Sequence, residues 1–246
     1  MENQFNSGLS AAIHLTMDSY HQGRALLEKS KTPDFTIKIA NSLEEREAVF
    51  SLAYKIYLEK GYIKANSQEW LIQNYDSNSE TIILIVQDTE KNIVGSATIL
   101  FDGALKLPAD LIYNKELAVL RQSDYRIAEL SRLIINKENR NSKQILVLLF
   151  NYAAIFIRHV KKYNNLIVQV NPRHKNYYKS LLSFEEIGKE KPCPSVQNAP
   201  ANLMSITSYQ YQNELNRFSD FQLIKKSERS LFQYFLKTEQ ESLVAY

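Results

Sequence analysis

An apolar segment over residues 144–157 constrains the fold more than any other feature, because Asn151 is its only interruption. It is shorter than the roughly 20 residues that cross a bilayer, so we expect a buried helix. Its basic flanks leave attachment to a membrane surface as the alternative. Strands are expected before it, over residues 126–135, and after it, over residues 166–170. Such a β-α-β crossover makes the two strands parallel neighbours, and ligands tend to bind at the edge between them.

Shorter patterns complete a mixed α/β layout. Alternating and β-branched runs predict further strands over residues 35–40, 81–86, 93–101, 184–188 and 201–209. Helices are expected from the cap at Asn41 or Ser42 to near Gly61, and over residues 67–74, 143–163 and 174–182. The strands 81–86 and 93–101 form an antiparallel hairpin, and residues 107–110 form a loop. Residues 1–34 are a polar, weakly helical extension, and residues 211–246 contain one or two amphipathic helices.

Composition excludes several kinds of binding site. The chain has 6 glycines among 246 residues, and no two of them form G-x-G, which excludes the P-loop and the dinucleotide fingerprint. The four histidines form no H-E-x-x-H, and one cysteine, Cys193, cannot make a disulfide or a cysteine-based zinc site, so no metal is expected. A lone cysteine and the lack of a secretory signal predict a cytoplasmic protein. The net charge of +3 is too small to imply nucleic-acid binding.

The charge is unevenly distributed. Residues 121–191 carry 14 Lys and Arg against 6 Asp and Glu, a net charge of +8 within a chain whose net charge is +3. A basic segment in a nearly neutral chain indicates an acidic partner or a phosphate group. The alternative is a solvated surface with scattered charge.

Three motifs resemble known enzymes. Residues 129–133 read Glu-Leu-Ser-Arg-Leu, which resembles the E-[IL]-S-R-L strand of two branches of the GNAT acyltransferase superfamily. These branches are the acyl-homoserine-lactone autoinducer synthases and the long-chain N-acyl amino acid synthases of the FeeM type. Residues 170–174 (Val-Asn-Pro-Arg-His) and 198–204 (Asn-Ala-Pro-Ala-Asn-Leu-Met) are similar to motifs of the second branch. The likeness covers about residues 35–210, and implies a GNAT-like mixed central sheet flanked by helices, with extensions at 1–34 and 211–246.

The resemblance also bears on the acyl donor. The pyrophosphate loop of the GNAT superfamily, Q/R-x-x-G-x-G/A, aligns with residues 140–145, where Lys143 and Ile145 fill both glycine positions. Backbone amides that cradle a pyrophosphate need close approach, which glycine permits. The resemblance therefore implies a donor without a pyrophosphate, namely the phosphopantetheine arm of acyl carrier protein. Acyl-CoA is disfavoured, and no tightly bound cofactor is expected.

The implied reaction is attack of an amino acid's α-amine on an acyl thioester, giving an N-acyl amino acid. Glu129 is the expected general base, directly or through water; alternatively it only pairs with Arg132 or Arg46. Arg132 would anchor a carboxylate or form a structural ion pair, and Tyr178 would protonate the leaving thiolate or simply pack. Backbone amides near Ile134 are the expected oxyanion site. The remaining candidates are, for substrate binding, Arg46, Phe50, Ser131, Ile134, Asn171 and Arg173, and, for the acyl donor and its carrier protein, Arg140, Lys143 and Arg158.

Two other functions stay open at this point. One is autoinducer synthesis from S-adenosylmethionine, which the motifs at residues 170–174 and 198–204 disfavour. The other is a non-catalytic module with the same fold that binds lipid or a membrane. Retention of Glu129, Arg132 and Tyr178 together favours catalysis over the second alternative.

Overall fold

In the computed structural model, residues 35–139, 141–218 and 229–237 are described. Within them, seven strands form one sheet in the order β1-β2-β3-β4-β5-β7-β6. The strands are β1 (Thr36–Ile39), β2 (Ile82–Gln87), β3 (Ile93–Phe101), β4 (Ile127–Ile135), β5 (Asn165–Val170), β6 (Glu185–Cys193) and β7 (Ala199–Thr207). The α-helices are α2 (Leu43–Glu59), α3 (Asp110–Gln122), α4 (Ser142–Ile155), α5 (Lys175–Leu182) and α6 (Ser208–Arg217). The expected GNAT-like mixed sheet flanked by helices is confirmed.

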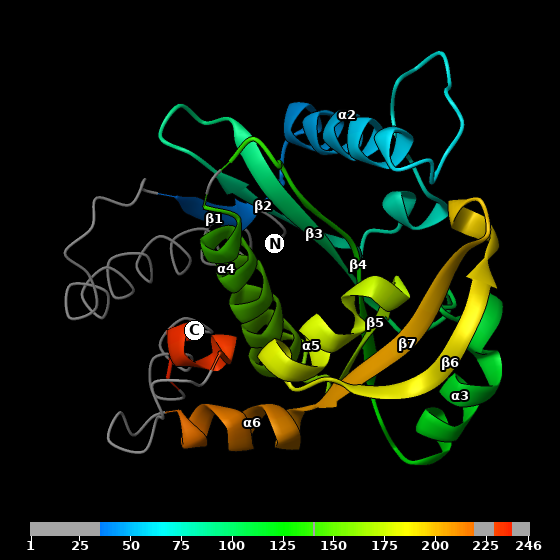
Figure 1. The fold of residues 1–246 in the computed structure, drawn as a ribbon, viewed down its shortest axis with the longest axis vertical. Helices are drawn as coiled ribbons and strands as arrows, with labels where there is room; N and C mark the ends of the chain where they lie inside the picture. Colours follow the sequence, from blue (N-terminus) through cyan, green and yellow to red (C-terminus); the bar gives the residue numbers. More distant parts are fainter. Residues whose placement is uncertain (1–34, 140, 219–228, 238–246) are drawn as a thin grey trace.

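Helices cover both faces of the sheet (Figure 1). Successive side chains of β2 point to opposite faces of the sheet and pack against different helical layers. Leu84 and Val86 belong to the core under α4, whereas Ile83 and Ile85 pack beneath α2 on the other face. Helix α3 extends the α2 layer over the far end of the sheet. Helices α5 and α6 extend the α4 layer, so the central strands are buried between two helical layers, whereas much of the edge strand β6 is exposed.

The apolar segment is the buried helix that its sequence predicted. Residues Ser142–Val160 form the one described stretch with the length and hydropathy to cross a membrane, and 72% of its most apolar window is buried inside the protein. Its polar interruption, Asn151, has a structural role. The Asn151 side chain donates to the Tyr211 hydroxyl at 3.3 Å and accepts from the Leu236 amide at 3.3 Å. Asn151 therefore ties α4 to α6 and to Leu236, which follows the 3-10 helix η5 (Leu231–Tyr234).

Strands β4 and β5 pair in parallel, as the crossover predicted, but only over a short length. Their ladder joins Ile127, Ala128 and Glu129 to residues 165–167 and then ends. Beyond it β5 stays paired with β7, and β4 stays paired with β3. A bulge interrupts the second pairing, because Arg132 and Leu133 both lie opposite Ala97, and Arg132 takes a left-handed φ of 44°. The two central strands therefore diverge from Glu129 onward.

One predicted helix is wrong, and one helix of the structure was not predicted. No α-helix forms over residues 67–74, where a turn leads into the 3-10 helix η1 (Asn74–Ser77). Helix α3 was not predicted at all, because only Tyr113 and Leu117 of it are buried and its backbone kinks at Tyr113. Elsewhere β6 runs five residues beyond its predicted end at Gly188, and α6 begins at Ser208. The predictions for residues 1–34 lie outside the described residues, as does much of the 211–246 extension.

Candidate active site

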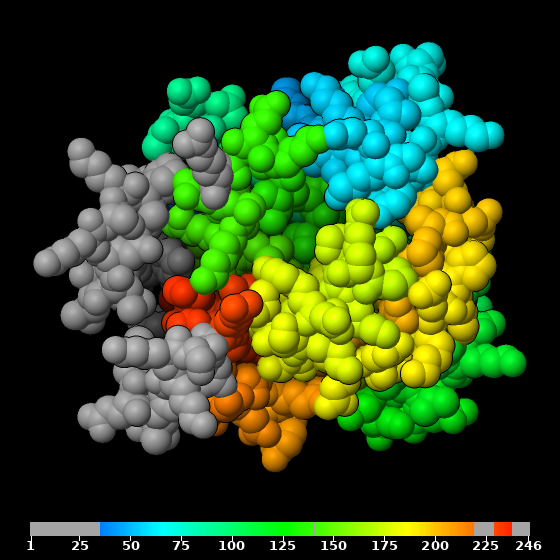
Figure 2. All heavy atoms as spheres, in the orientation of Figure 1, coloured from blue at the N-terminus to red at the C-terminus, as the bar shows by residue number. Residues whose placement is uncertain are grey.

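A cavity of about 380 Å³ lies where β4 and β5 diverge. Figure 2 shows the surface hollowed between the cyan segment after α2, the green segment around β4 and yellow-green α5. The cavity wall combines Leu130 and Leu133 of β4, Val168 and Gln169 of β5, and the connection between β6 and β7. The motifs at residues 129–133, 170–174 and 198–204 are far apart in sequence, yet each contributes to this wall. The cavity is therefore the place where their chemistry can act together.

Glu129 presents a carboxylate to this cavity while being only 1% exposed. Its Oε2 accepts the backbone N–H of Ala109 at 2.9 Å, and its Oε1 accepts the side-chain amide of Gln169 at 2.8 Å. Burial raises the pKa of Glu129 to about 7, although the hydrogen bonds from Gln169 and Ala109 oppose the shift. A carboxyl with that pKa is partly ionised at neutral pH, which suits a group that accepts a proton.

A network of ion pairs fixes the loop that contains Ala109, the backbone donor to Glu129. Arg121 on α3 contacts Asp110 at 2.7 Å and Asp102 at 2.7 Å. Asp110 in turn accepts the backbone N–H of Leu107 at 3.0 Å. These contacts set the start of α3, and with it the direction of the Ala109 amide. The unpredicted helix α3 therefore supplies a hydrogen-bond donor to the candidate base.

Arg132 has a partner that the sequence did not identify. Its guanidinium forms a two-point ion pair with Asp76, with nitrogen–oxygen distances of 2.8 and 2.5 Å. The other N–H groups donate to Leu71 O and to the Thr98 hydroxyl. Since all five N–H groups are engaged and the residue is 3% exposed, this geometry supports the structural ion pair rather than a carboxylate anchor. The alternative in which Glu129 pairs with Arg132 or Arg46 is wrong.

Tyr178 lies on the cavity wall and is packed by aromatic rings. Its ring contacts Phe150 and Phe184 edge to face, with centroids 5.8 and 5.6 Å away. Burial raises the pKa of its phenol, so it stays protonated over the physiological range. Within the described part of the chain, its hydroxyl makes no hydrogen bond. Tyr57 shares these properties, because it also lines the cavity and its pKa is also raised by burial.

The structure brings together only some of the predicted substrate-binding residues. Ser131, Asn171 and Arg173 line the cavity. Phe50 lies outside it, under the Arg132 guanidinium at 5.1 Å, and Arg46 donates to the Asp76 carbonyl at 3.4 Å. Both therefore support the Arg132–Asp76 pair. Ile134 is buried against α2 and is not part of the cavity wall.

Of the predicted donor-binding cations, the two that the structure describes do not form one patch. Arg140 lies outside the described residues. Lys143 is at the start of α4, where it donates to the Tyr234 hydroxyl at 3.0 Å. Arg158 is 15 residues further on and donates to Gln212 at 2.6 Å. A helix rises 1.5 Å per residue, so these two side chains are about 22 Å apart along it.

The cavity residues that the sequence reasoning missed include Tyr57, Lys60, Tyr62 and Gln169. The first three lie at or just after the end of α2, which carries no motif that would single them out. Gln169 did leave a signal. It is a polar residue near the end of a strand that is otherwise apolar from Leu166 onward, and a covered strand has few reasons to hold one.

Comparisons with known proteins identify the family and the fold. A family model described as "N-acyl amino acid synthase FeeM" matches residues 48–207. FeeM, an N-acyl amino acid synthase from uncultured soil microbes, is a similar solved structure, with a TM-score of 0.65 and 25% identity over 74% of this chain and 94% of that one.

Two autoinducer synthases share the fold at lower identity. The AHL synthase LasI has a TM-score of 0.56 and 15% identity over 72% of this chain and 91% of its own. BjaI, a CoA-dependent acyl-homoserine lactone synthase, has a TM-score of 0.52 and 13% identity over 80% and 90%. No curated protein sequence matches the chain.

Proposed function

The chain belongs to the FeeM family of N-acyl amino acid synthases, acyltransferases of GNAT-like fold, and on that premise we propose that it joins a long acyl chain to the α-amine of an amino acid. The donor in this proposal is the thioester on the phosphopantetheine arm of acyl carrier protein. The product is an N-acyl amino acid.

One observation carries the proposal. A carboxyl that is almost completely buried, with a pKa raised to about 7 by burial, opens onto a cavity large enough for a small substrate. Such a group is poised to accept a proton near neutral pH. The Glu129 oxygens also have fixed directions, because Ala109 and Gln169 each hold one of them.

The reaction follows from this placement. The acceptor amine transfers a proton to Glu129, and its nitrogen attacks the thioester carbonyl carbon. A carbon–nitrogen bond forms as the carbon–sulfur bond breaks, and the leaving thiolate takes a proton from Tyr178. The proton held by Glu129 then returns through solvent to Tyr178, which restores both groups. Beyond Glu129, the β4 amides that face β5 have no ladder partner, which makes them available to the oxyanion. Leu130 and Leu133 line the cavity whereas Ile134 does not, so we place the oxyanion site nearer Leu130 than the sequence suggested.

The environment of α4 supports a carrier-protein donor. Ile145, which fills a glycine position of the pyrophosphate loop, is 0% exposed and packs over Gly95 of β3. A Cβ added at Gly95 would lie 2.5 Å from the Ile145 side chain, so this contact is close. A core residue therefore occupies a position where a pyrophosphate would need bare backbone. Since BjaI is described as CoA-dependent, the fold itself admits either donor, and an assay must separate them.

The test is to express the protein in a bacterium and to analyse the organic extract by mass spectrometry. We expect new N-acyl amino acids with the wild-type chain and none with Glu129→Gln. Acyl lactones would identify an autoinducer synthase instead, and no new lipid would favour a binding module. With purified protein, acyl carrier protein and acyl-CoA are then compared as donors. A higher kcat/KM with acyl-CoA would overturn the proposed donor.

A further inference from the structure

Arg173 is held at the edge of the cavity in a fixed orientation. Its Nε donates to Nε2 of His174 at 3.1 Å, and its Nη2 donates to the Tyr62 hydroxyl at 3.1 Å. These contacts use two of its five N–H groups. The remaining three have no partner within the described part of the chain and lie on the forked end of the guanidinium. This end is the part that grips a carboxylate or a phosphate with two hydrogen bonds.

Lys60 adds a second positive charge beside Arg173. It lines the same cavity, and in the described residues its ammonium group makes no hydrogen bond or ion pair. Its acidic neighbour Glu59 is bonded to Lys137. Burial lowers the pKa of Lys60, and the charge of Arg173 lowers it further. Burial and the charges of Arg173 and Lys60 likewise lower the pKa of His174, which agrees with its role as the acceptor for Arg173.

Negative and positive side chains of the cavity are therefore separate from one another. Glu129 is the one carboxylate among its lining residues, and Asp76 neutralises the remaining cation, Arg132. Lys60 and Arg173 are exposed at the cavity mouth and form no ion pair in the described residues, although keeping two like charges adjacent is unfavourable. A bound anion would remove this cost.

We propose that Arg173 and Lys60 form an anion-binding subsite at the mouth of the cavity, with His174 and Tyr62 orienting the guanidinium. The ligand is a carboxylate or phosphate group of a substrate. On the proposed function it belongs either to the carboxylate of the acceptor amino acid or to the phosphate of the phosphopantetheine arm, and the identity of the ligand rests on that function.

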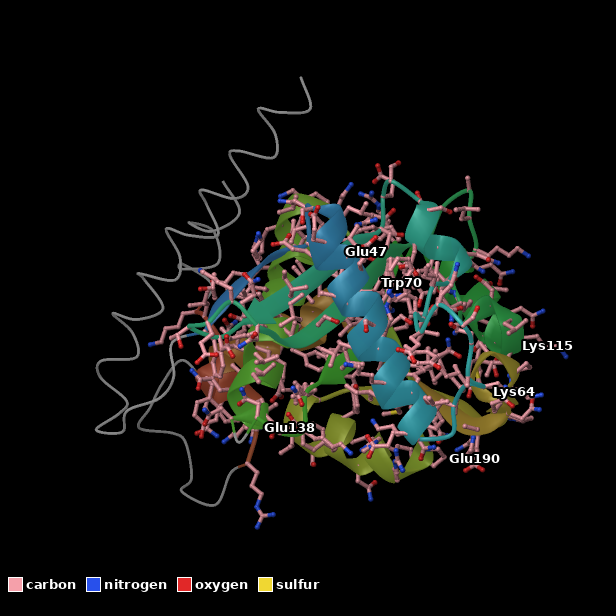
Figure 3. The ribbon with its side chains drawn as sticks, turned by 90° about the horizontal axis from the view of Figure 1, so that it is seen from above. Glu47, Lys64, Trp70, Lys115, Glu138 and Glu190 are labelled. Atoms are coloured by element: carbon pink, nitrogen blue, oxygen red, sulfur yellow. The ribbon has the colours of Figure 1, made fainter. Side chains whose placement is uncertain are left out.

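Anion binding is tested first without any reaction. The pKa of His174 is followed by proton NMR, its signal assigned by its loss in His174→Gln. Inorganic phosphate and acetate, at constant ionic strength, serve as probes. We expect phosphate to raise the pKa of His174 in the wild type, and to have no effect on it in Arg173→Met. Lys64→Met is the control, since Lys64 is exposed at the edge of the molecule and outside the cavity wall (Figure 3). An unchanged pKa of His174 in wild-type protein would overturn the proposal.

Kinetics then separate the two sources. If the site binds the acceptor, Arg173→Met should raise the KM of the amino acid about 10- to 100-fold. The same variant should leave the KM of the corresponding amino acid amide unchanged. If the site binds the donor, Arg173→Met raises the KM of the acyl donor instead. Arg173→Lys should then raise that KM less than Arg173→Met does. Unchanged KM values for both substrates would count against the subsite while leaving the acyl transfer itself intact. If the proposed function is wrong, the wild type shows no acyl transfer. The NMR titration would still show whether the anion-binding subsite exists.

Discussion

The side-chain amide of Gln169 donates to Oε1 of Glu129 at 2.8 Å, just beyond the point where the ladder between β4 and β5 ends. The other atom of that amide, Oε1 of Gln169, is buried and has no hydrogen-bond partner in the described part of the chain. The side-chain N–H of Gln169 therefore bridges the two diverging strands, and its Oε1 is free to accept a further hydrogen bond. The effect of Glu129→Gln and the effect of pH both depend on this contact between Gln169 and Glu129.

Glu129→Gln should fold and lose about 10²- to 10⁴-fold in kcat. The new amide can keep the Ala109 contact with its oxygen. If the Gln169 amide rotates, its free oxygen can accept the new N–H group. In the wild type, kcat should rise with pH to a plateau, with a midpoint near the raised pKa of about 7, because only the ionised carboxylate accepts a proton. A stopped assay across pH 5.5–9 measures both effects, and a fully active Glu129→Gln would exclude Glu129 as the base.

Glu129 should also make stability depend on pH. Its pKa is raised in the folded state, so its contribution is complete below the unfolded value of 4.5 and is lost as pH rises through about 7. The difference corresponds to about 3 kcal/mol. Urea unfolding at pH 5 and pH 8 should therefore show a larger loss of stability for the wild type than for Glu129→Gln. Equal losses of stability in the two proteins would mean that burial does not raise the pKa of Glu129.

Arg132→Met should destabilise the protein by about 3–5 kcal/mol, because it leaves the Asp76 carboxylate buried without a partner. Replacing both residues, as in Asp76→Leu with Arg132→Met, should recover much of the loss. Urea unfolding measures these values, with Lys64→Met as the control. If Arg132→Met instead kept its stability and raised the KM of the acceptor, Arg132 would be a substrate ligand after all.

Tyr178→Phe should lower kcat by at least about 10²-fold if its phenol protonates the leaving thiolate. Tyr57→Phe is the matched control, since it removes a second hydroxyl of the same cavity that has no hydrogen-bond partner within the described residues. Single-turnover kinetics separate the chemical step from product release. A large loss in Tyr57→Phe alone would transfer the role to Tyr57.

Restoring the loop glycines should not create a CoA enzyme. Ile145→Gly removes a fully buried side chain and should cost about 2–5 kcal/mol, with about 1 kcal/mol more for glycine in a helix. Lys143→Gly removes an exposed side chain and should cost only about 1 kcal/mol. Thermal unfolding and the ratio of kcat/KM for the two donors test this. A gain in acyl-CoA use by the double variant would show that the missing glycines alone select the donor.

The sequence was most informative where a pattern is local. The apolar run of α4 and the strands on either side of it predicted the parallel β4–β5 pair, because burial periodicity is set by neighbouring residues. Helix α3 has only two buried side chains, so its pattern was too weak to detect. The motif at residues 129–133 identified Glu129 and Arg132 as chemically important, but not what each of them contacts.

Those contacts depend on residues far away in the chain. Asp76 meets Arg132 across 56 positions, Ala109 reaches Glu129 across 20, and Arg173 reaches Tyr62 across 111. By itself, the sequence determined the order of the seven strands and which side chains carry reactive groups. Only the tertiary structure decided which charges are neutralised and which remain free. A charge's pKa and availability depend on burial and on partners that the folded sheet brings near it.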